Sequence, residues 1–158
     1  MLPAIIGRPI RVEVRPSLGR FLAAASIPRR IILLDEEVLD GNGDFERILV
    51  HELFHFVWVR LSNELRRDWE LLLGGEIEHD AAGELGWSAE WRKSKVTERD
   101  CRLRTARWRR YACESFCDTA AWRFAGLKSH CEYTLTARFR RSRRQWFERH
   151  VESGELQI

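Results

Sequence analysis

Residues 10–35 carry the hydrophobic pattern of a small β-sheet. Apolar and charged residues alternate over residues 10–15, which is the period of a strand with one buried face. Residues 21–26 form a second candidate strand that stops before Pro28, and the apolar run at 30–35 is the clearest strand candidate in the chain. We therefore predict an N-terminal sheet of about three strands, antiparallel or mixed.

Helical periodicity dominates the rest of the chain. A turn of helix at 36–40 precedes a helix over residues 45–61, for which Asn42 or Asp44 is the expected N-cap. The buried stripe of this helix should include Ile48, Phe56 and Val59. Further helices are predicted over residues 65–73, ending at Gly74–Gly75, over 98–125, closed by Gly126, and over 135–151, with a helix-loop insertion between 76 and 97.

The composition is that of one globular α+β domain spanning residues 1–158. Hydrophobic residues make up 44% of the chain and charged residues 32%, so a chain of this length can bury a core without covalent cross-links. The longest apolar run, at 48–59, is interrupted by two histidines and a glutamate, which argues against a membrane span. No signal peptide is expected from the first residues, so we predict a cytoplasmic location.

The cysteines and arginines of this chain do not by themselves indicate a metal site or a nucleic-acid interface. The four cysteines should be reduced, and Cys113 and Cys117, four residues apart, are interpreted as core residues rather than metal ligands. The net charge is only +3, with an arginine excess that indicates compositional bias. The arginines of residues 138–149 are spread around their predicted helix, which favours a solvated face over a nucleic-acid interface.

The strongest chemical signal is the sequence HELFH at residues 51–55. On a helix, His51 and His55 project from one face, close enough to bind a single metal ion. Glu52 follows the first histidine, where it can take a proton from a metal-bound water. If these were ordinary core residues, three polar side chains would be buried without evident partners, which is costly. We therefore predict a Zn²⁺ site with two histidine ligands and Glu52 as the catalytic base.

A catalytic zinc site needs a third protein ligand and an open position for water. The residues after His55 lack the metzincin extension, so the third ligand must come from another helix. Glu114 is the best candidate, and Asp118 lies one turn later on the same face, where it can accept the second ring N–H of a ligand histidine. The alternative is that both acids are solvated or paired with Arg107 and Arg110.

The two motifs together resemble a known pattern. HELFH followed at a distance by Glu114-Ser115-Phe116-Cys117-Asp118 resembles the gluzincin pattern of zinc metallopeptidases, HExxH followed by ExxxD. The order of strands, zinc helix and glutamate helix over residues 28–126 resembles the minimal zincin-like domains, including the ImmA/IrrE type.

The resemblance implies a ligand set and a substrate geometry. It implies that His51, His55 and Glu114 hold zinc and that Glu52 is the general base. It also implies that the strand at 30–35 is the edge strand that aligns an extended peptide by β-augmentation. The expected fold is accordingly zincin-like, with a small sheet packed on the two ligand-bearing helices and a mostly helical C-terminal half.

The predicted function is zinc-dependent hydrolysis of a peptide bond in a narrow protein or peptide substrate. The sequence offers three candidates for the group that stabilises the oxyanion and does not choose among them: Tyr111, His130 and Tyr133. The alternative function is a non-catalytic zincin-like module that keeps the fold and metal and works by binding a regulatory partner. The sequence predicts no oligomeric state.

Overall fold

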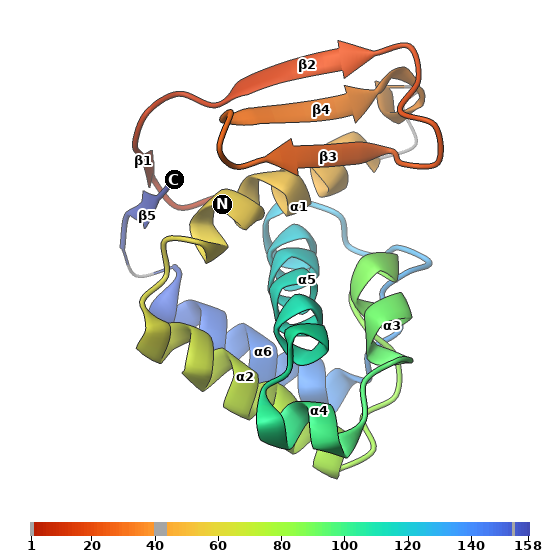
Figure 1. The fold of residues 1–158 in the computed structure, drawn as a ribbon, viewed down its shortest axis with the longest axis vertical. Helices are drawn as coiled ribbons and strands as arrows, with labels where there is room; N and C mark the ends of the chain where they lie inside the picture. The colour runs from red at the N-terminus through yellow and green to blue at the C-terminus, as the bar shows by residue number, and fades with distance from the viewer. Residues whose placement is uncertain (1, 40–43, 153) are drawn as a thin grey trace.

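A computed structural model describes residues 2–39, 44–152 and 154–158, and it shows an α+β fold with a small sheet lying on one side of a group of helices (Figure 1). The sheet contains β2 (Arg11–Arg15), β3 (Ala23–Ser26) and β4 (Ile31–Asp35) in the order β2-β4-β3. β2 is parallel to β4 and β3 is antiparallel to it. The predicted α+β class and mixed N-terminal sheet are confirmed.

The position of β4 corrects one expectation. The strand at 30–35 was expected at the edge of the sheet, but β4 pairs on both sides and is central. Its continuous apolar sequence fits that place, because Ile32 and Leu34 are buried against the helix beneath the sheet. The edge strand nearest the helices is β3, which pairs only with β4 within the described residues.

The outer edge strand β2 departs from the simple alternation rule. Val12 and Val14 pair with Ile32 and Leu34, so they share the inward face of the sheet. Each is nevertheless 47% exposed, because β2 lies beyond the helix that covers β3 and β4. The half-buried strand that the alternation predicted is therefore not borne out, since Glu13 is the one residue of β2 that is partly buried.

The helix α1 (Asp44–Trp58) runs beneath the sheet after a short 3-10 turn, η1 (Glu36–Leu39). Ile48 and Phe56 are buried against Ile32 and Leu34, as the helical stripe predicted. Val59 lies beyond the helix end and is exposed, so its assignment to the stripe is wrong. Of the two predicted N-caps, Asp44 is the first helical residue and Asn42 lies outside the described residues.

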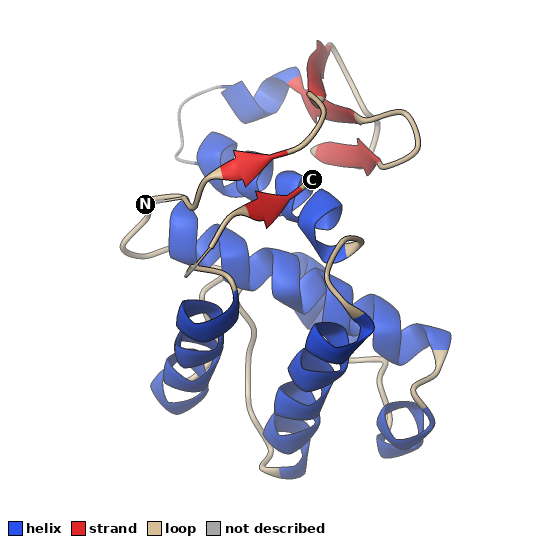
Figure 2. Cartoon of the chain, turned by 90° about the vertical axis from the view of Figure 1, so that its left-hand side faces the viewer, coloured by secondary structure: helices blue, strands red, loops and turns tan. Residues whose placement is uncertain are grey.

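Five further helices form the second part of the fold. They are α2 (Asn63–Glu78), α3 (Trp87–Lys93), α4 (Glu98–Leu103), α5 (Ala106–Phe124) and α6 (Ala137–His150). The short strands β1 (Ile5–Ile6) and β5 (Leu156–Gln157) pair in parallel and bring the two chain ends together (Figure 2). In the described part of the chain, no helix has the length and apolar character needed to cross a membrane.

α1 ends at Trp58, three residues before the predicted end, and two other helix boundaries also differ from the sequence prediction. α2 continues through Gly74–Gly75 to Glu78, because buried Leu73 and Glu76 on both sides hold the backbone in place. The single helix expected over 98–125 is two helices, separated at Arg104, whose φ of 48° is left-handed. Thr105 accepts a hydrogen bond from the backbone of Trp108 and starts α5 as a new helix.

α5 is the central helix and packs against α1, α2, α3 and α4. Its buried side chains meet an aromatic cluster in which the Phe116 ring lies between Trp58, Trp69 and Phe147. The Trp69 indole donates to the Ala112 carbonyl at 3.0 Å, which satisfies its buried N–H. This packing fixes α5 against α1 and so sets the geometry described next.

A buried ionic network ties α6 to the rest of the fold. The Arg143 guanidinium is fully buried and makes bidentate contacts with Glu76 and Glu84, at 2.6 Å and 2.7 Å for the shortest pairs. The Tyr111 hydroxyl donates to Glu84. Arg143 is therefore a structural residue, and it is not available to the nucleic-acid interface considered for 138–149.

Candidate metal centre

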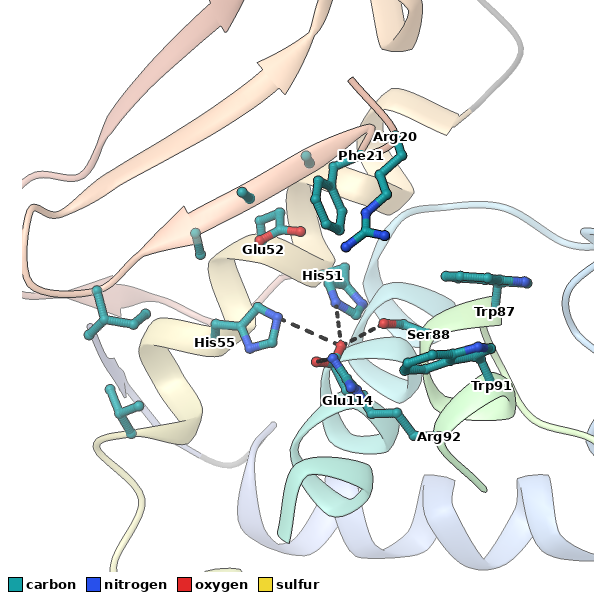
Figure 3. A pocket seen from close by; sticks show the side chains of 15 residues that line it. Arg20, Phe21, His51, Glu52, His55, Trp87, Ser88, Trp91, Arg92 and Glu114 are labelled. Atoms are coloured by element: carbon teal, nitrogen blue, oxygen red, sulfur yellow. Dashed lines mark hydrogen bonds and ion pairs between the residues drawn. The ribbon is translucent and has the colours of Figure 1, made fainter. Parts of the chain in front are cut away.

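Three side chains from two adjacent helices converge on one point (Figure 3). His51 and His55 project from α1, and Glu114 projects from α5 between them. Oε2 of Glu114 lies 3.3 Å from Nε2 of His51 and 3.9 Å from Nε2 of His55. The structure thus brings the two predicted histidines and the predicted third donor together, although they are separated by about 60 residues in sequence.

These separations fit a small tetrahedral ion. Bonds of about 2.0–2.1 Å to nitrogen and oxygen place tetrahedral ligand atoms about 3.3–3.4 Å apart. The His51–Glu114 separation equals this value, and the His55–Glu114 separation exceeds it by an amount that a small side-chain rotation removes. Two imidazoles and one carboxylate are also a donor set that zinc accepts.

A second donor combination overlaps the first. His51, His55 and Cys117 offer ligand atoms that all lie within 4.8 Å of one another, a group that could hold a metal ion. Cys117 Sγ, however, is 3.5 Å from Nδ1 of His55, on the opposite side of the ring from Glu114. We favour Glu114 as the third donor because its carboxylate oxygen faces Nε2 of both histidines.

Asp118 lies where the sequence predicted a partner for a histidine. Its Oδ1 is 2.7 Å from Nδ1 of His51, which leaves Nε2 of that ring directed at Glu114. Its Oδ2 accepts a hydrogen bond from the Ala89 backbone at 2.9 Å. Both carboxylate oxygens are therefore engaged, and the ring orientation of His51 is fixed from behind.

Glu114 has partners that the sequence reasoning did not find. Its Oε2 accepts a hydrogen bond from Ser88 at 2.8 Å, and its Oε1 pairs with Arg92 at 2.9 Å. Both residues come from α3, within the segment that was interpreted only as an insertion. The alternative pairing with Arg107 is wrong, since Arg107 contacts Asp100 instead.

The charges of the site stabilise one another. Burial disfavours the charged form of His51, but the Asp118 and Glu114 carboxylates overcome this effect and raise the pKa of His51 well above its ordinary value. Burial likewise opposes ionisation of Glu114, yet His51, His55 and Arg92 hold its pKa well below the usual range. A metal ion entering this set must displace the proton on His51, so binding should strengthen as pH rises.

Glu52 differs from Glu114 and Asp118, the other carboxylates of the site, in its partners. It is 8% exposed, and its side chain has no hydrogen bond or ion pair with any described residue. In Figure 3 it points from α1 toward β3, beside the histidine pair. Its carboxylate oxygens are not among the buried polar atoms that lack a partner, so they open onto the space in front of the site.

That space is a cleft of about 640 Å³ between β3 and α3. One wall contains the small side chains of Ala23, Ala24 and Ala25 of β3, and the other is formed by Trp87 and Trp91 of α3. The two indoles stack with centroids 6.1 Å apart and are largely exposed. A further hollow of about 370 Å³ continues past His51 and Glu52 toward Arg47.

None of the three predicted oxyanion candidates lines this cleft in the described structure. Tyr111 is buried against Glu84, and His130 lies 3.2 Å from Asp44. The Tyr133 hydroxyl is buried without a partner among the described residues, and burial raises the pKa of Tyr133 to about 12. The cations that do line the cleft are Arg20 and Arg92.

Gly86 allows α3 to approach the site. A Cβ at this position would overlap the Asp118 carboxylate, so only glycine permits the contact between Asp118 and the start of α3. We expect Gly86→Ala to displace Asp118 from His51 and to weaken zinc binding by about 10–100-fold, measured by competition with a chromophoric chelator.

Gly75→Ala is the matched control, because a Cβ there meets no atom within 4 Å. It should leave zinc affinity unchanged while slightly favouring the helix. If Gly86→Ala bound zinc as tightly as the unmodified protein, the Asp118–His51 contact would not contribute to zinc affinity.

Comparison with known proteins found no matching family model, no matching curated protein and no matching solved structure.

Proposed function

We propose that this protein is a zinc-dependent peptidase whose site has the zincin-like arrangement. The observation that carries the proposal is the position of Glu52, whose carboxylate opens onto the cleft without a hydrogen-bond partner among the described residues, adjacent to a two-histidine and carboxylate donor set. His51, His55 and Glu114 would hold the ion. Zinc in such a site lowers the pKa of its water toward about 7 and polarises the scissile carbonyl.

The side chains of the chain would then act in distinct roles. Glu52 takes a proton from the attacking water and returns it to the leaving amine, because it lines the cleft beside the histidine pair and makes no ion pair at contact distance with any described residue. Asp118 orients His51, while Ser88 and Arg92 orient Glu114. Arg20, whose guanidinium enters the cleft in Figure 3, is the residue we assign to oxyanion stabilisation.

The free edge of β3 supports a peptide substrate. β3 borders the cleft and pairs on only one side within the described residues, so its outward N–H and C=O groups can pair with an extended chain. The alanines of β3 present little side-chain bulk above this edge. Phe21, Trp87 and Trp91 add apolar surface for a side chain of that peptide.

The proposal is tested by screening a peptide library with zinc-loaded protein. We expect cleavage that a chelator abolishes and that added zinc restores, because the ion and Glu52 act on the same water. Cleavage that persists after chelation would exclude zinc-dependent hydrolysis. Stoichiometric zinc without cleavage of any library member would favour the non-catalytic binding module instead.

A further inference from the structure

The two thiols of α5 lie on the side of His55 that the proposed zinc site does not use. Cys113 Sγ and Cys117 Sγ are each 3.5 Å from Nδ1 of His55. The cysteines are one helical turn apart and so share one face of α5. Nε2 of the His55 ring thus faces a carboxylate, and Nδ1 faces two sulfur atoms.

We propose that Nδ1 of His55, Cys113 and Cys117 form a second metal site, selective for a soft, thiophilic ion such as Cu⁺ or Cd²⁺. For an ion of the size of zinc, bonds of about 2.3 Å to sulfur and 2.0–2.1 Å to nitrogen separate the two donor types by about 3.5–3.6 Å in a tetrahedral site. Both nitrogen–sulfur separations in the structure have this value. Two thiolates and one imidazole are a donor set that selects soft ions over hard ones.

Binding at this site has a defined proton balance. Two metal–sulfur bonds and one metal–nitrogen bond form, and the two thiol protons leave to solvent. Cys117 is buried and Cys113 is partly exposed, so an ion can enter from the side of Cys113 and become enclosed. The other thiols do not contribute, since Cys101 packs near Gly74 and Cys131 lies beside His130.

The two donor sets compete for one ring. A neutral imidazole has a single free lone pair, so binding through Nδ1 places the proton on Nε2, and Nε2 can then no longer ligate an ion held by Glu114. A soft ion would therefore antagonise the zinc centre. This consequence rests on the proposed function, whereas the thiol site itself does not.

The experiment is a titration of the reduced protein with Cd²⁺, followed through the ultraviolet thiolate-to-cadmium charge-transfer band. We expect a saturable band in the unmodified protein that is kept in His51→Ala and Glu114→Ala, because neither residue belongs to the thiol site. The double variant Cys113→Ser/Cys117→Ser should lose the band, and circular dichroism should show that it remains folded.

The matched control is Cys101→Ser/Cys131→Ser, which removes the same number of thiols and should retain the full band. Folded unmodified protein without a thiolate band would overturn the proposal, as would a band that persists in Cys113→Ser/Cys117→Ser. The readout does not involve hydrolysis, so failure of this site and failure of the peptidase proposal are separate results.

Discussion

Replacing Glu52 by glutamine is expected to lower peptide hydrolysis by about 10²–10⁴-fold while leaving the bound zinc in place. Glutamine has nearly the same shape but cannot take a proton from water, and Glu52 is not among the side chains that face the histidine nitrogens. The measurement pairs the cleavage rate of a library-selected peptide with zinc content by metal analysis of the same sample.

Glu46→Gln is the control for this substitution, because Glu46 is an exposed glutamate near the start of the same helix. It should change neither hydrolysis nor zinc content. If Glu52→Gln retained the full hydrolysis rate, the assignment of Glu52 as the base would be wrong, whatever its zinc content.

Replacing Arg143 by alanine is expected to destabilise the fold by about 3–5 kcal/mol. The substitution removes the only described side-chain cation within 3.0 Å of the Glu76 and Glu84 carboxylates and leaves both carboxylates buried. Lys93 is 3.5 Å from Glu84, too long for a close pair, and its ammonium also donates to the carbonyls of Ala81 and Gly83. The free energy of unfolding is measured by urea denaturation followed by circular dichroism.

Arg141→Ala tests whether this loss is specific. Arg141 is exposed on the same helix, so its removal should change the free energy of unfolding by no more than about 0.5 kcal/mol. Equal stabilities for Arg141→Ala and Arg143→Ala would contradict the structural role of the buried network. An Arg143→Ala protein that is produced only in unfolded form would agree with it.

Local patterns were sufficient to predict the two site helices. HELFH fixes the spacing of His51 and His55 by helical geometry alone, and the four-residue step from Glu114 fixes the face of Asp118. The strands at 10–15 and 30–35 were likewise recognisable because their patterns are local. The structure places these residues on helices and strands as expected, although the second site helix begins at Ala106 and not at residue 98.

Non-local features could not be predicted in this way. The central place of β4 depends on pairing with β2 and β3, which strand propensity does not specify. The contribution of α3 depends on how a polar segment packs against α5, and only the four-residue spacing of Trp87 and Trp91 hinted at a shared face. Gly86 lets the start of α3 approach Asp118, and the residues next to Gly86 in the sequence do not indicate this contact.

The buried arginine shows a different limit of sequence reasoning. Arg143 stands among other arginines of α6, and composition alone assigns all of them to solvent. Its burial follows from Glu76 and Glu84, which approach from distant parts of the chain. An arginine-rich helix can therefore contain one core residue that its neighbours do not distinguish.

The central claim, that His51, His55 and Glu114 hold zinc, is tested most directly by the zinc content of purified variants. The claim predicts about one zinc ion per chain in the unmodified protein and in Cys117→Ala, with a large loss in both His51→Ala and Glu114→Ala. Cys117→Ala separates the two overlapping donor groups, because it removes the sulfur and leaves the Glu114 set intact. Zinc retained by Glu114→Ala and lost from Cys117→Ala would contradict the claim and move the third ligand to the thiol.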